Sequence, residues 1–553
     1  MTDNVQLNQN TSGGSRIATT VDSGELHHQR VILEGEDSAG EPVGVSATPY
    51  GQLEVELPMH RLPFGSLHTE SLTPVIQADA VYGVNSFLNN ATTGLAVGTG
   101  SGSGSVTGTN NVFKASTGTT QYSFATLQSR RRLRYRPGQG LIGRFAGLFS
   151  TPAASSIVVA GFGTAESGYF FGYNGTSFGV LKSTGGLREY HTLTITTPST
   201  ATNNYVITLP STATVSIAAT NNSNATQTAH EISLGDFPGW SAEARGNTVV
   251  FLANSAGSVA GSITLSQPGA ATPAAATTAE TTAGAAATDT WVPQASWNGD
   301  RLDGTGPSGV TLDPAKGNVY QVGMQYLGFG IVMMQIEVST AAAGTRFVTV
   351  HTFHNPNTLT APHQTQPSFP FTMAAYSAGS TTDVSVSVGS YAGFIEGHAV
   401  NIGPRMSYGV TAAVTSSTSA YTPLFTARNS LIFNGRPNQS VAKLISVHGA
   451  AKSTNGLTTF YLIRNATLSA GTVNFTQFDT ASSTYWDKGA TACTLGSDSR
   501  VIWSGITAES DSFNFSFADH EITLQPGETV TLAVRSVTAT ATCVGGLNTR
   551  EDQ

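Results

Sequence analysis

Residues Ser167–Ser183, SGYFFGYNGTSFGVLKS, indicate the fold class of this chain. Aromatic residues, which are typical of strands, stand on both sides of Asn174-Gly175, a dipeptide that favours the two-residue turn of a β-hairpin. The stretch also contains Gly-Thr-Ser-Phe-Gly, a pattern in which Ser177 could act as a hydrolase nucleophile. That role needs a sharp strand-to-helix turn, and no helical pattern follows. We therefore expect a hairpin and no catalytic serine.

The rest of the chain has the same character. Of its 553 residues, 60 are glycine, 39% are hydrophobic and only 11% are charged. Short runs rich in Val, Thr and aromatic residues alternate with glycine corners, and no long stretch shows apolar residues at helical spacing. The sequence predicts an all-β chain of several domains.

Changes in composition predict three regions. Residues 1–110 would form an N-terminal attachment region, with short strands at Gln29–Glu34 and Leu53–Leu57 and a Gly/Ser/Thr-rich linker at its end. Residues 111–410 would form a central β-sandwich of the jelly-roll type. Residues 411–553 would form a C-terminal antiparallel β-sandwich.

A small inserted domain is predicted within the central sandwich, at residues 191–290, where aromatic residues become scarce. Its best helix candidate is TQTAHEISLGDF, at residues 226–237. The alanine-rich stretch at residues 268–290 lacks an apolar stripe and is interrupted by Pro and Gly. We expect an extended hairpin there rather than a second helix.

Charge and cysteine content narrow the functional classes. The net charge of −8 has the wrong sign for a protein that coats nucleic acid. The N-terminus lacks the basic start and apolar core of a signal peptide, and no apolar run is long enough to span a membrane. We therefore expect assembly in a reducing cytoplasm, where Cys493 and Cys543 stay free thiols.

Motifs in the first hundred residues resemble those of tailed-bacteriophage virion proteins, especially those of marine phages. The sequence GQLEVELP at Gly51–Pro58 is followed by Phe64-Gly65 and then by Tyr82-Gly83-Val84-Asn85. The resemblance implies that this segment is a docking and crossover element that packs against another subunit. The residues it marks for attachment are Phe64, Gly65, Tyr82, Gly83 and Asn85.

Two later blocks extend the resemblance. SRRRLRYRPGQGLIGRFAGLF, GYFFGYNGTSFGVL and WNGDRLDGTGPSGVTLDPAKGNVYQVGMQYLGFG look like a concanavalin-like β-sandwich associated with viruses. RNSLIFNGRPNQS, LQPGETVTLAV and the closing Arg550-Glu551-Asp552 resemble a sandwich found at the ends of viral structural proteins. Together these motifs cover most of the chain.

The resemblance implies a structural virion protein, a tail fibre or baseplate-associated appendage that is assembled in the host cytoplasm. Its partners would be other virion proteins and further copies of itself, with a trimer favoured. We expect no enzymatic activity, no cofactor, no bound metal, no nucleic-acid partner and no membrane span. One alternative is a head decoration or vertex fibre, and another is a receptor protein that binds or cleaves host surface glycans.

Five arginines crowd into SRRRLRYRPGQG, at residues 129–140. On an extended strand Arg132, Arg134 and Arg136 would point to one side. They could form a solvated face, or they could meet an acidic neighbour on another subunit, because guanidinium pairs well with carboxylates. The sequence does not choose between these two interpretations.

Other residues have possible roles in metal binding. Asp300, Asp303 and Asp313 lie in a glycine-rich loop and could bind Ca²⁺, but their spacing fits no EF-hand. The favoured interpretation is that these aspartates accept hydrogen bonds from backbone N–H groups of the loop itself. His351 and His354 would lie on opposite faces of a strand, so they could not share one zinc ion without a bend.

A glycan-related function would need a different set of residues. Trp240, Trp291 and Trp297 could stack on sugar rings, but filling of aromatic cores is the favoured interpretation. Cleavage of a glycan would need two carboxylates about 5 to 9.5 Å apart, and the sequence marks no such pair.

Overall fold

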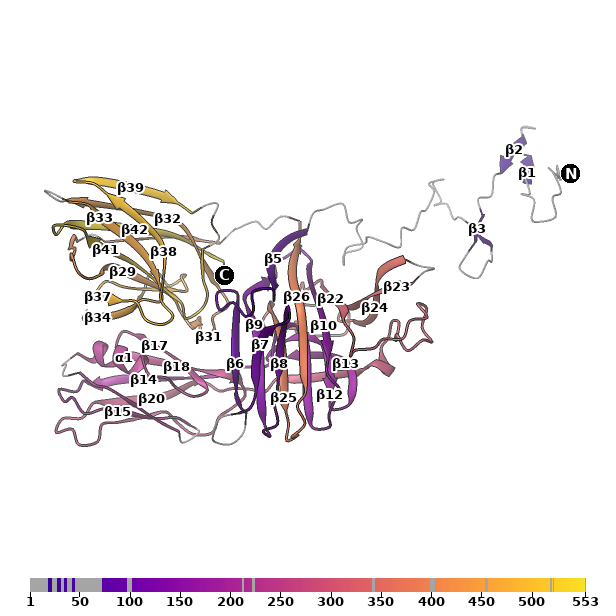
Figure 1. Ribbon diagram of the computed structural model, residues 1–553, viewed down its shortest axis with the longest axis horizontal. Helices are drawn as coiled ribbons and strands as arrows, with labels where there is room; N and C mark the ends of the chain where they lie inside the picture. Colours follow the sequence, from indigo (N-terminus) through magenta and orange to yellow (C-terminus); the bar gives the residue numbers. More distant parts are fainter. Residues whose placement is uncertain are drawn as a thin grey trace. The chain divides into compact units, whose positions relative to one another are not determined.

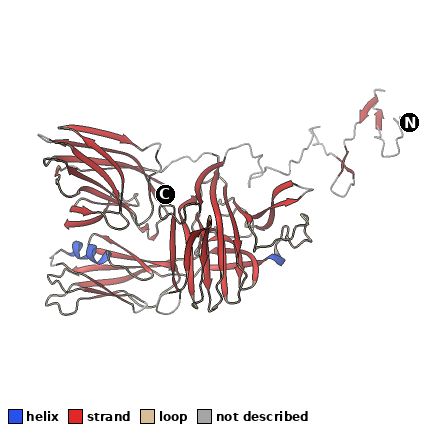
Figure 2. Cartoon of the chain, in the orientation of Figure 1, coloured by secondary structure: helices blue, strands red, loops and turns tan. Residues whose placement is uncertain are grey.

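The structure is a computed structural model. It describes residues 72–552, apart from 97–101, 211–212, 221–223, 341–343, 398–402, 411, 453–455, 518–519 and 521, and four short strands before residue 45. Strands dominate these described residues, as Figure 2 shows. The one α-helix among them is α1 (Ala225–Ser233), and η1 (Gln294–Ser296) is a short 3-10 helix. The predicted all-β, multidomain class is confirmed.

The chain divides into two units, residues 1–69 and residues 70–553. In the first unit, two strand pairs are described: β1 (Ala18–Val21) with β2 (His27–Arg30), and β3 (Glu34–Glu36) with β4 (Pro42–Gly44). The strand predicted at Gln29–Glu34 overlaps the end of β2 and the start of β3. The strand predicted at Leu53–Leu57 lies outside the described residues.

Two sheets form the central sandwich of the second unit (Figure 1). The eight-stranded sheet has the order β24-β23-β22-β10-β26-β8-β7, and β5 also pairs with β26. Its strands are β5 (Leu72–Asp79), β7 (Ser105–Thr109), β8 (Val112–Ser116), β10 (Leu141–Phe149), β22 (Asn318–Met324), β23 (Val332–Thr340), β24 (Gly344–Phe353) and β26 (Ser385–Glu396).

The seven-stranded sheet has the order β21-β13-β12-β11-β25-β9-β6. Its strands are β6 (Asn89–Leu95), β9 (Ser123–Arg134), β11 (Ser156–Thr164), β12 (Ser167–Asn174), β13 (Ser177–Thr184), β21 (Thr288–Pro293) and β25 (Ser368–Ser377). The β12–β13 hairpin was predicted, but its two-residue loop is Gly175-Thr176, because Asn174 already pairs with Ser177.

Aromatic rings fill the space between the two sheets. Phe145 of β10 stacks on Tyr320 of β22 with ring centres 5.0 Å apart, and Phe371 stacks on Tyr391 at 4.1 Å. Gly143 leaves room for one of these rings, since a Cβ there would lie 2.3 Å from the ring of Phe162. The core thus uses one face of each strand, as the pleat requires.

Three strands between residues 72 and 109 lie in these two sheets, although composition assigned this part of the chain to the attachment region. β5 pairs with β26, β6 with β9, and β7 with β8. The Gly/Ser/Thr-rich stretch suggested a linker because it has few apolar side chains. Ladder hydrogen bonds use backbone groups, so such a stretch can still form an edge strand.

The inserted region folds around its own core. Its sheets have the orders β17-β18-β14-β20 and β16-β15-β19. Their strands are β14 (Arg188–Thr197), β15 (Tyr205–Thr208), β16 (Thr214–Ile217), β17 (Trp240–Arg245), β18 (Thr248–Ala256), β19 (Thr264–Ser266) and β20 (Ala275–Thr282). Leu187 and Ala285 exchange backbone hydrogen bonds of 2.9 and 3.0 Å where the chain enters and leaves.

Two local predictions for this region can be compared with the structure. The helix predicted within residues 226–237 is present as α1, with Asn224 as its N-cap, but it ends at Ser233. The stretch at 268–290 is extended, but it does not form a hairpin. Its two strands belong to different sheets, because β20 pairs with β14 and β21 pairs with β13.

The C-terminal sandwich also consists of two sheets, ordered β27-β42-β32-β39, with β28 and β40 attached, and β35-β36-β29-β41-β33-β38. Its strands are β27 (Arg405–Gly409), β28 (Val414–Thr415), β29 (Thr422–Asn429), β32 (Val441–Lys452), β33 (Thr458–Arg464), β35 (Thr476–Gln477), β36 (Thr484–Asp487), β38 (Arg500–Thr507), β39 (Asp511–Ser516), β40 (Thr523–Leu524), β41 (Thr529–Ser536) and β42 (Thr542–Asp552). Cys493 and Cys543 are free and buried. Burial raises the pKa of Cys493 to about 12 and that of Cys543 to about 11, so neither is an activated thiol.

Candidate functional site

A hollow of about 650 Å³ lies on the outer face of the eight-stranded sheet, where β5, β26, β10 and β22 meet. The strand pleat determines which residues line it. Phe145 points into the core and is 1% exposed, so its neighbours Arg144 and Ala146 point outward. The hollow has the size of a small-molecule site, which typically measures about 300–1,000 Å³.

Small residues in two adjacent rows across the strands form its floor. In the first row Gln77 pairs with Ala392, and Ala392 pairs with Arg144. In the second row Ser390 pairs with both Asp79 and Ala146. The larger side chains therefore stand around the two alanines, and the missing volume above the alanine methyl groups is the hollow.

Arg144 is the cation of the hollow and is half-buried. Its guanidinium lies over the rings of Phe347 and Phe394, at 5.0 and 5.8 Å from their centres. Burial lowers the pKa of Arg144 from its ordinary value, and the charge of Glu337 opposes that shift. No ion pair within the described part of the chain includes Arg144.

A polar row continues from Arg144 across the sheet. The Nε of Arg144 donates to Oε1 of Gln321, and Nε2 of Gln321 donates to Oε1 of Gln335. Gln335 then donates to the hydroxyl of Thr349 at 3.1 Å. This row holds the guanidinium in one orientation and uses only its Nε donor.

The turn after β5 forms one wall of the hollow. Tyr82 is 96% exposed, and Gly83 has a φ of +76°, a conformation that favours glycine. Oδ1 of Asn85 accepts from the backbone N–H of Phe87 at 2.9 Å. The structure thus brings Tyr82, Gly83 and Asn85 together at the hollow, whereas Phe64 and Gly65 lie outside the described residues.

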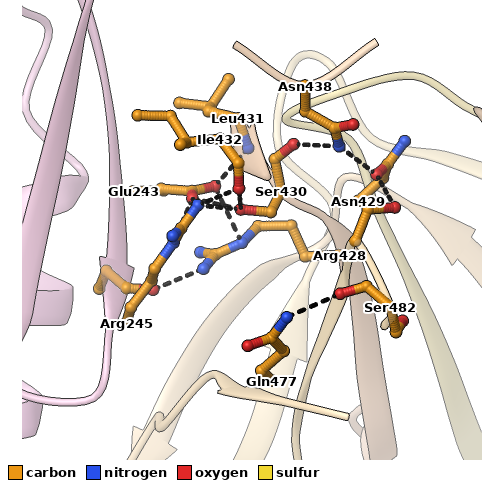
Figure 3. A network of polar contacts seen from close by, with 12 residues as sticks. Glu243, Arg245, Arg428, Asn429, Ser430, Leu431, Ile432, Asn438, Gln477 and Ser482 are labelled. Atoms are coloured by element: carbon orange, nitrogen blue, oxygen red, sulfur yellow. Dashed lines mark hydrogen bonds and ion pairs between the residues drawn. The ribbon is translucent and has the colours of Figure 1, made fainter. Parts of the chain in front are cut away.

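A second polar cluster, which we call the charged joint, connects the inserted region to the C-terminal sandwich (Figure 3). Glu243 of β17 lies at its centre. One carboxylate oxygen is 2.7 Å from Nη2 of Arg245, and the other is 3.4 Å from Nε of Arg428, close enough for an ion pair but not aligned for a hydrogen bond. The carboxylate also accepts from the Ser430 hydroxyl at 2.5 Å and from the Leu431 N–H at 2.9 Å.

The two arginines of the charged joint are covered by aromatic rings of the C-terminal sandwich. Arg428 lies 4.0 Å from the centre of the Phe475 ring, and Arg245 lies 4.7 Å from that of Tyr485. Burial by itself would raise the pKa of Glu243, but Arg428 and Arg245 hold it below its ordinary value. Every charge here has a partner, so the arrangement is that of a packed interface.

The arginine-rich stretch at residues 129–140 contacts polar groups of the same chain. Nη2 of Arg136 lies 3.1 Å from Oδ2 of Asp552. Arg134 donates to the carbonyl of Gln439 at 3.4 Å. Arg132 is desolvated, and this burial, together with the charge of Arg188, lowers its pKa to about 10. The solvated-face interpretation is therefore wrong for these three residues, while a contact with another subunit stays a prediction.

The aspartates in the glycine-rich loop accept from nearby backbone N–H groups, as expected. Asp300 accepts from Leu302 at 2.9 Å and from Ser308 at 2.7 Å. Asp303 accepts from Thr305 at 2.9 Å, and Asp313 accepts from Ala315 at 3.0 Å. The described residues contain no group of three or more His, Cys, Asp or Glu that could hold a metal ion.

Other candidate residues belong to cores or strand faces. His351 is buried and His354 is exposed, so the two do not form a pair of ligands. Trp240 and Trp297 are buried, and Trp291 is partly buried on β21. The favoured interpretation as core residues is confirmed for Trp240 and Trp297.

Sequence reasoning did not find the hollow. Its two alanines lie nearly 250 positions apart, and nothing in either strand marks them. No protein-family model, curated protein or solved structure matches this chain. Among the residues that the structure describes, no helix is long and apolar enough to cross a membrane.

Proposed function

We propose that this chain is a structural virion protein of a tailed bacteriophage, a tail fibre or baseplate-associated appendage that docks through its N-terminal region. Residues 70–553 form one compact unit, and its β modules meet through a buried charged contact, Glu243 with Arg428, and a partly exposed one, Arg136 with Asp552. Domains within one chain move relative to one another unless their interface is well packed. A projecting particle protein needs such packed interfaces, and the sequence motifs support the same role.

The charged joint is the observation that carries this proposal. The carboxylate of Glu243 is 3% exposed and Arg428 is 7% exposed, so both charged groups are desolvated and each is the other's ion-pair partner. Removal of charges from water is costly and gives little net stability, but it enforces one arrangement of the partners. A structural protein that holds other parts of a particle in place needs such a fixed arrangement of its own domains.

Exposed apolar residues suggest where copies of the chain meet. β38 and β39 are the outer strands of the two C-terminal sheets. Val501 and Ile506 on β38 are 41% and 65% exposed, and Phe515 on β39 is 37% exposed. Strand edges that are unpaired and carry exposed apolar side chains tend to associate with other chains. This edge is therefore a subunit contact in the proposed oligomer, for which a trimer is favoured.

A second candidate function is contact with host surface glycans, and the hollow favours it. The hollow places a cation, hydrogen-bonding side chains and an exposed tyrosine around an open floor. A head decoration or vertex fibre would use the same architecture at another place on the particle.

Mass spectrometry of purified particles, followed by immunogold electron microscopy, tests the virion role. We expect the chain in the particle at fixed copy number, with label on the tail or baseplate. A variant that lacks residues 1–69 should fold, because these residues belong to a separate unit, but should not be incorporated. Absence of the full chain from particles contradicts the virion role, and incorporation of the truncated chain contradicts docking through the N-terminal region.

A further inference from the structure

We propose that the hollow on the eight-stranded sheet binds an acidic saccharide, a sugar ring with one carboxylate, and that Arg144 holds the carboxylate. This inference rests on the proposed contact with host glycans and names the ligand class and the residues.

Arg144 presents an oriented pair of donors without an acidic partner. Its Nε is taken by Gln321, and the two phenylalanine rings flank the guanidinium. The terminal nitrogens remain, and in this geometry they match the two oxygens of a carboxylate. The charge of Glu337 acts on Arg144 without forming an ion pair with it, so the terminal nitrogens stay available to the negative charge of a ligand.

Three side chains offer hydrogen bonds to hydroxyl groups: Gln77 and Asp79 of β5, across the floor from Arg144, and Ser390 on the floor itself. Gln77 and Ser390 are exposed, and no hydrogen bond of their side chains is present among the described residues. Asp79 uses Oδ1 to accept from the Val81 N–H at 3.0 Å, which leaves its other oxygen as an acceptor. An amide and a carboxylate on one side, a hydroxyl on the floor and a guanidinium on the other side fit a ring with several hydroxyls and one acid group.

The electrostatic balance limits how much negative charge the ligand carries. Asp79 lies in the same hollow, and the whole chain has a net charge of −8. A phosphorylated or multiply charged ligand would meet repulsion that one arginine cannot offset. A single carboxylate per sugar unit satisfies Arg144 without that repulsion.

The exposed ring of Tyr82 completes the site. A residue that is 96% exposed contributes little to the core of its own chain. At the wall of the hollow, its ring offers an apolar surface to the C–H face of a sugar, and its hydroxyl stays in water. The positive φ of Gly83 allows the tight turn that presents this ring.

Isothermal titration calorimetry on the full chain tests the inference. The probes are the methyl glycosides of glucuronic, galacturonic and N-acetylneuraminic acid, with methyl glucoside as the neutral sugar and acetate as the bare carboxylate. We expect at least one acidic glycoside to bind more tightly than both methyl glucoside and acetate. Arg144→Gln should weaken that binding tenfold or more, because it removes charge-assisted hydrogen bonds.

Two further variants separate the hollow from the rest of the sheet. Ala392→Leu fills the floor and should abolish binding while Arg144 is retained. Arg346→Gln removes an exposed arginine of β24, outside the hollow, and should leave the affinity unchanged. Thermal unfolding of each variant shows whether it has folded.

Several results would overturn the inference. These are no binding of any acidic glycoside at millimolar concentration, equal binding of acidic and neutral sugars, equal binding of acetate, or an Arg144→Gln affinity equal to that of the wild type. The virion role would be unaffected by these results, since incorporation into particles is measured separately. A chain that binds the acid but is absent from particles would instead refute only the virion role.

Discussion

The charged joint and the hollow both centre on an arginine flanked by aromatic rings, yet they differ in the partner of that arginine. Arg428 is 7% exposed, faces Glu243 and lies over Phe475. Arg144 is half-buried, lies over two phenylalanine rings and has no ion-pair partner among the described residues. A matched buried charge serves the fold, whereas an oriented and unmatched charge beside open space is available to a ligand.

The charged joint should show the largest effect on stability. Glu243→Gln leaves Arg428 and Arg245 without a carboxylate, and removal of one partner from a buried ion pair costs about 3–5 kcal/mol. We expect a loss of this size in the free energy of unfolding of the inserted and C-terminal regions, measured by urea titration.

Glu280 provides a matched control for this change, because it is an exposed glutamate on β20 of the same inserted region. Glu280→Gln should change the free energy of unfolding by no more than about 0.5 kcal/mol. Equal effects of the two substitutions would show that the joint does not hold these regions together.

Acid should weaken the same interface. Burial, followed by the charge of Arg428, lowers the pKa of His230 on α1 from 6.5 to about 4. Below pH 6.5 His230 therefore binds a proton in the unfolded chain but stays neutral in the folded chain. The free energy of unfolding decreases as the pH drops from about 6.5 to about 4. The slope from this residue approaches about 1.4 kcal/mol per pH unit.

His230→Gln removes this proton linkage, so the dependence of stability on pH in that range should become flatter. Urea titrations at pH 7, 6 and 5 measure the slope for both proteins. An unchanged slope in the variant would show that other groups cause the acid sensitivity.

The ion pair of Arg136 with Asp552 should contribute less to stability than the charged joint, because its side chains are 14% and 29% exposed. Water screens such a pair, and partly exposed ion pairs contribute about 0.2–1 kcal/mol. Arg136→Ala should lower the free energy of unfolding by an amount in this range. A loss comparable to that of Glu243→Gln would place the arginine-rich strand with the charged joint as a principal contact.

Arg144→Gln should have the smallest effect on stability. Among these charged clusters Arg144 has no ion pair to lose, but the change removes its hydrogen bond to Gln321 and its contact with two rings, so we expect a loss of no more than about 1 kcal/mol in the free energy of unfolding. A large loss of stability would mean that Arg144 serves the sheet rather than a ligand, and it would remove the contrast between the two clusters.

Local sequence patterns determined the features that depend on neighbouring residues. The aromatic runs around Asn174-Gly175 predicted the β12–β13 hairpin, and the stretch at 226–237 predicted α1. Aspartates next to glycines predicted the backbone contacts of Asp300 and Asp303. In each case the interacting groups lie a few residues apart, so the local sequence contains the cause.

Tertiary structure alone decided where distant strands pair. Strand β7 lies in a Gly/Ser/Thr-rich stretch, yet it extends the eight-stranded sheet through backbone hydrogen bonds with β8, which composition does not reveal. The register of β10 against β26 brings Ala392 beside Arg144, and the packing of the inserted region brings Glu243 to Arg428. These contacts depend on long-range register and docking, and no short stretch of sequence determines either one.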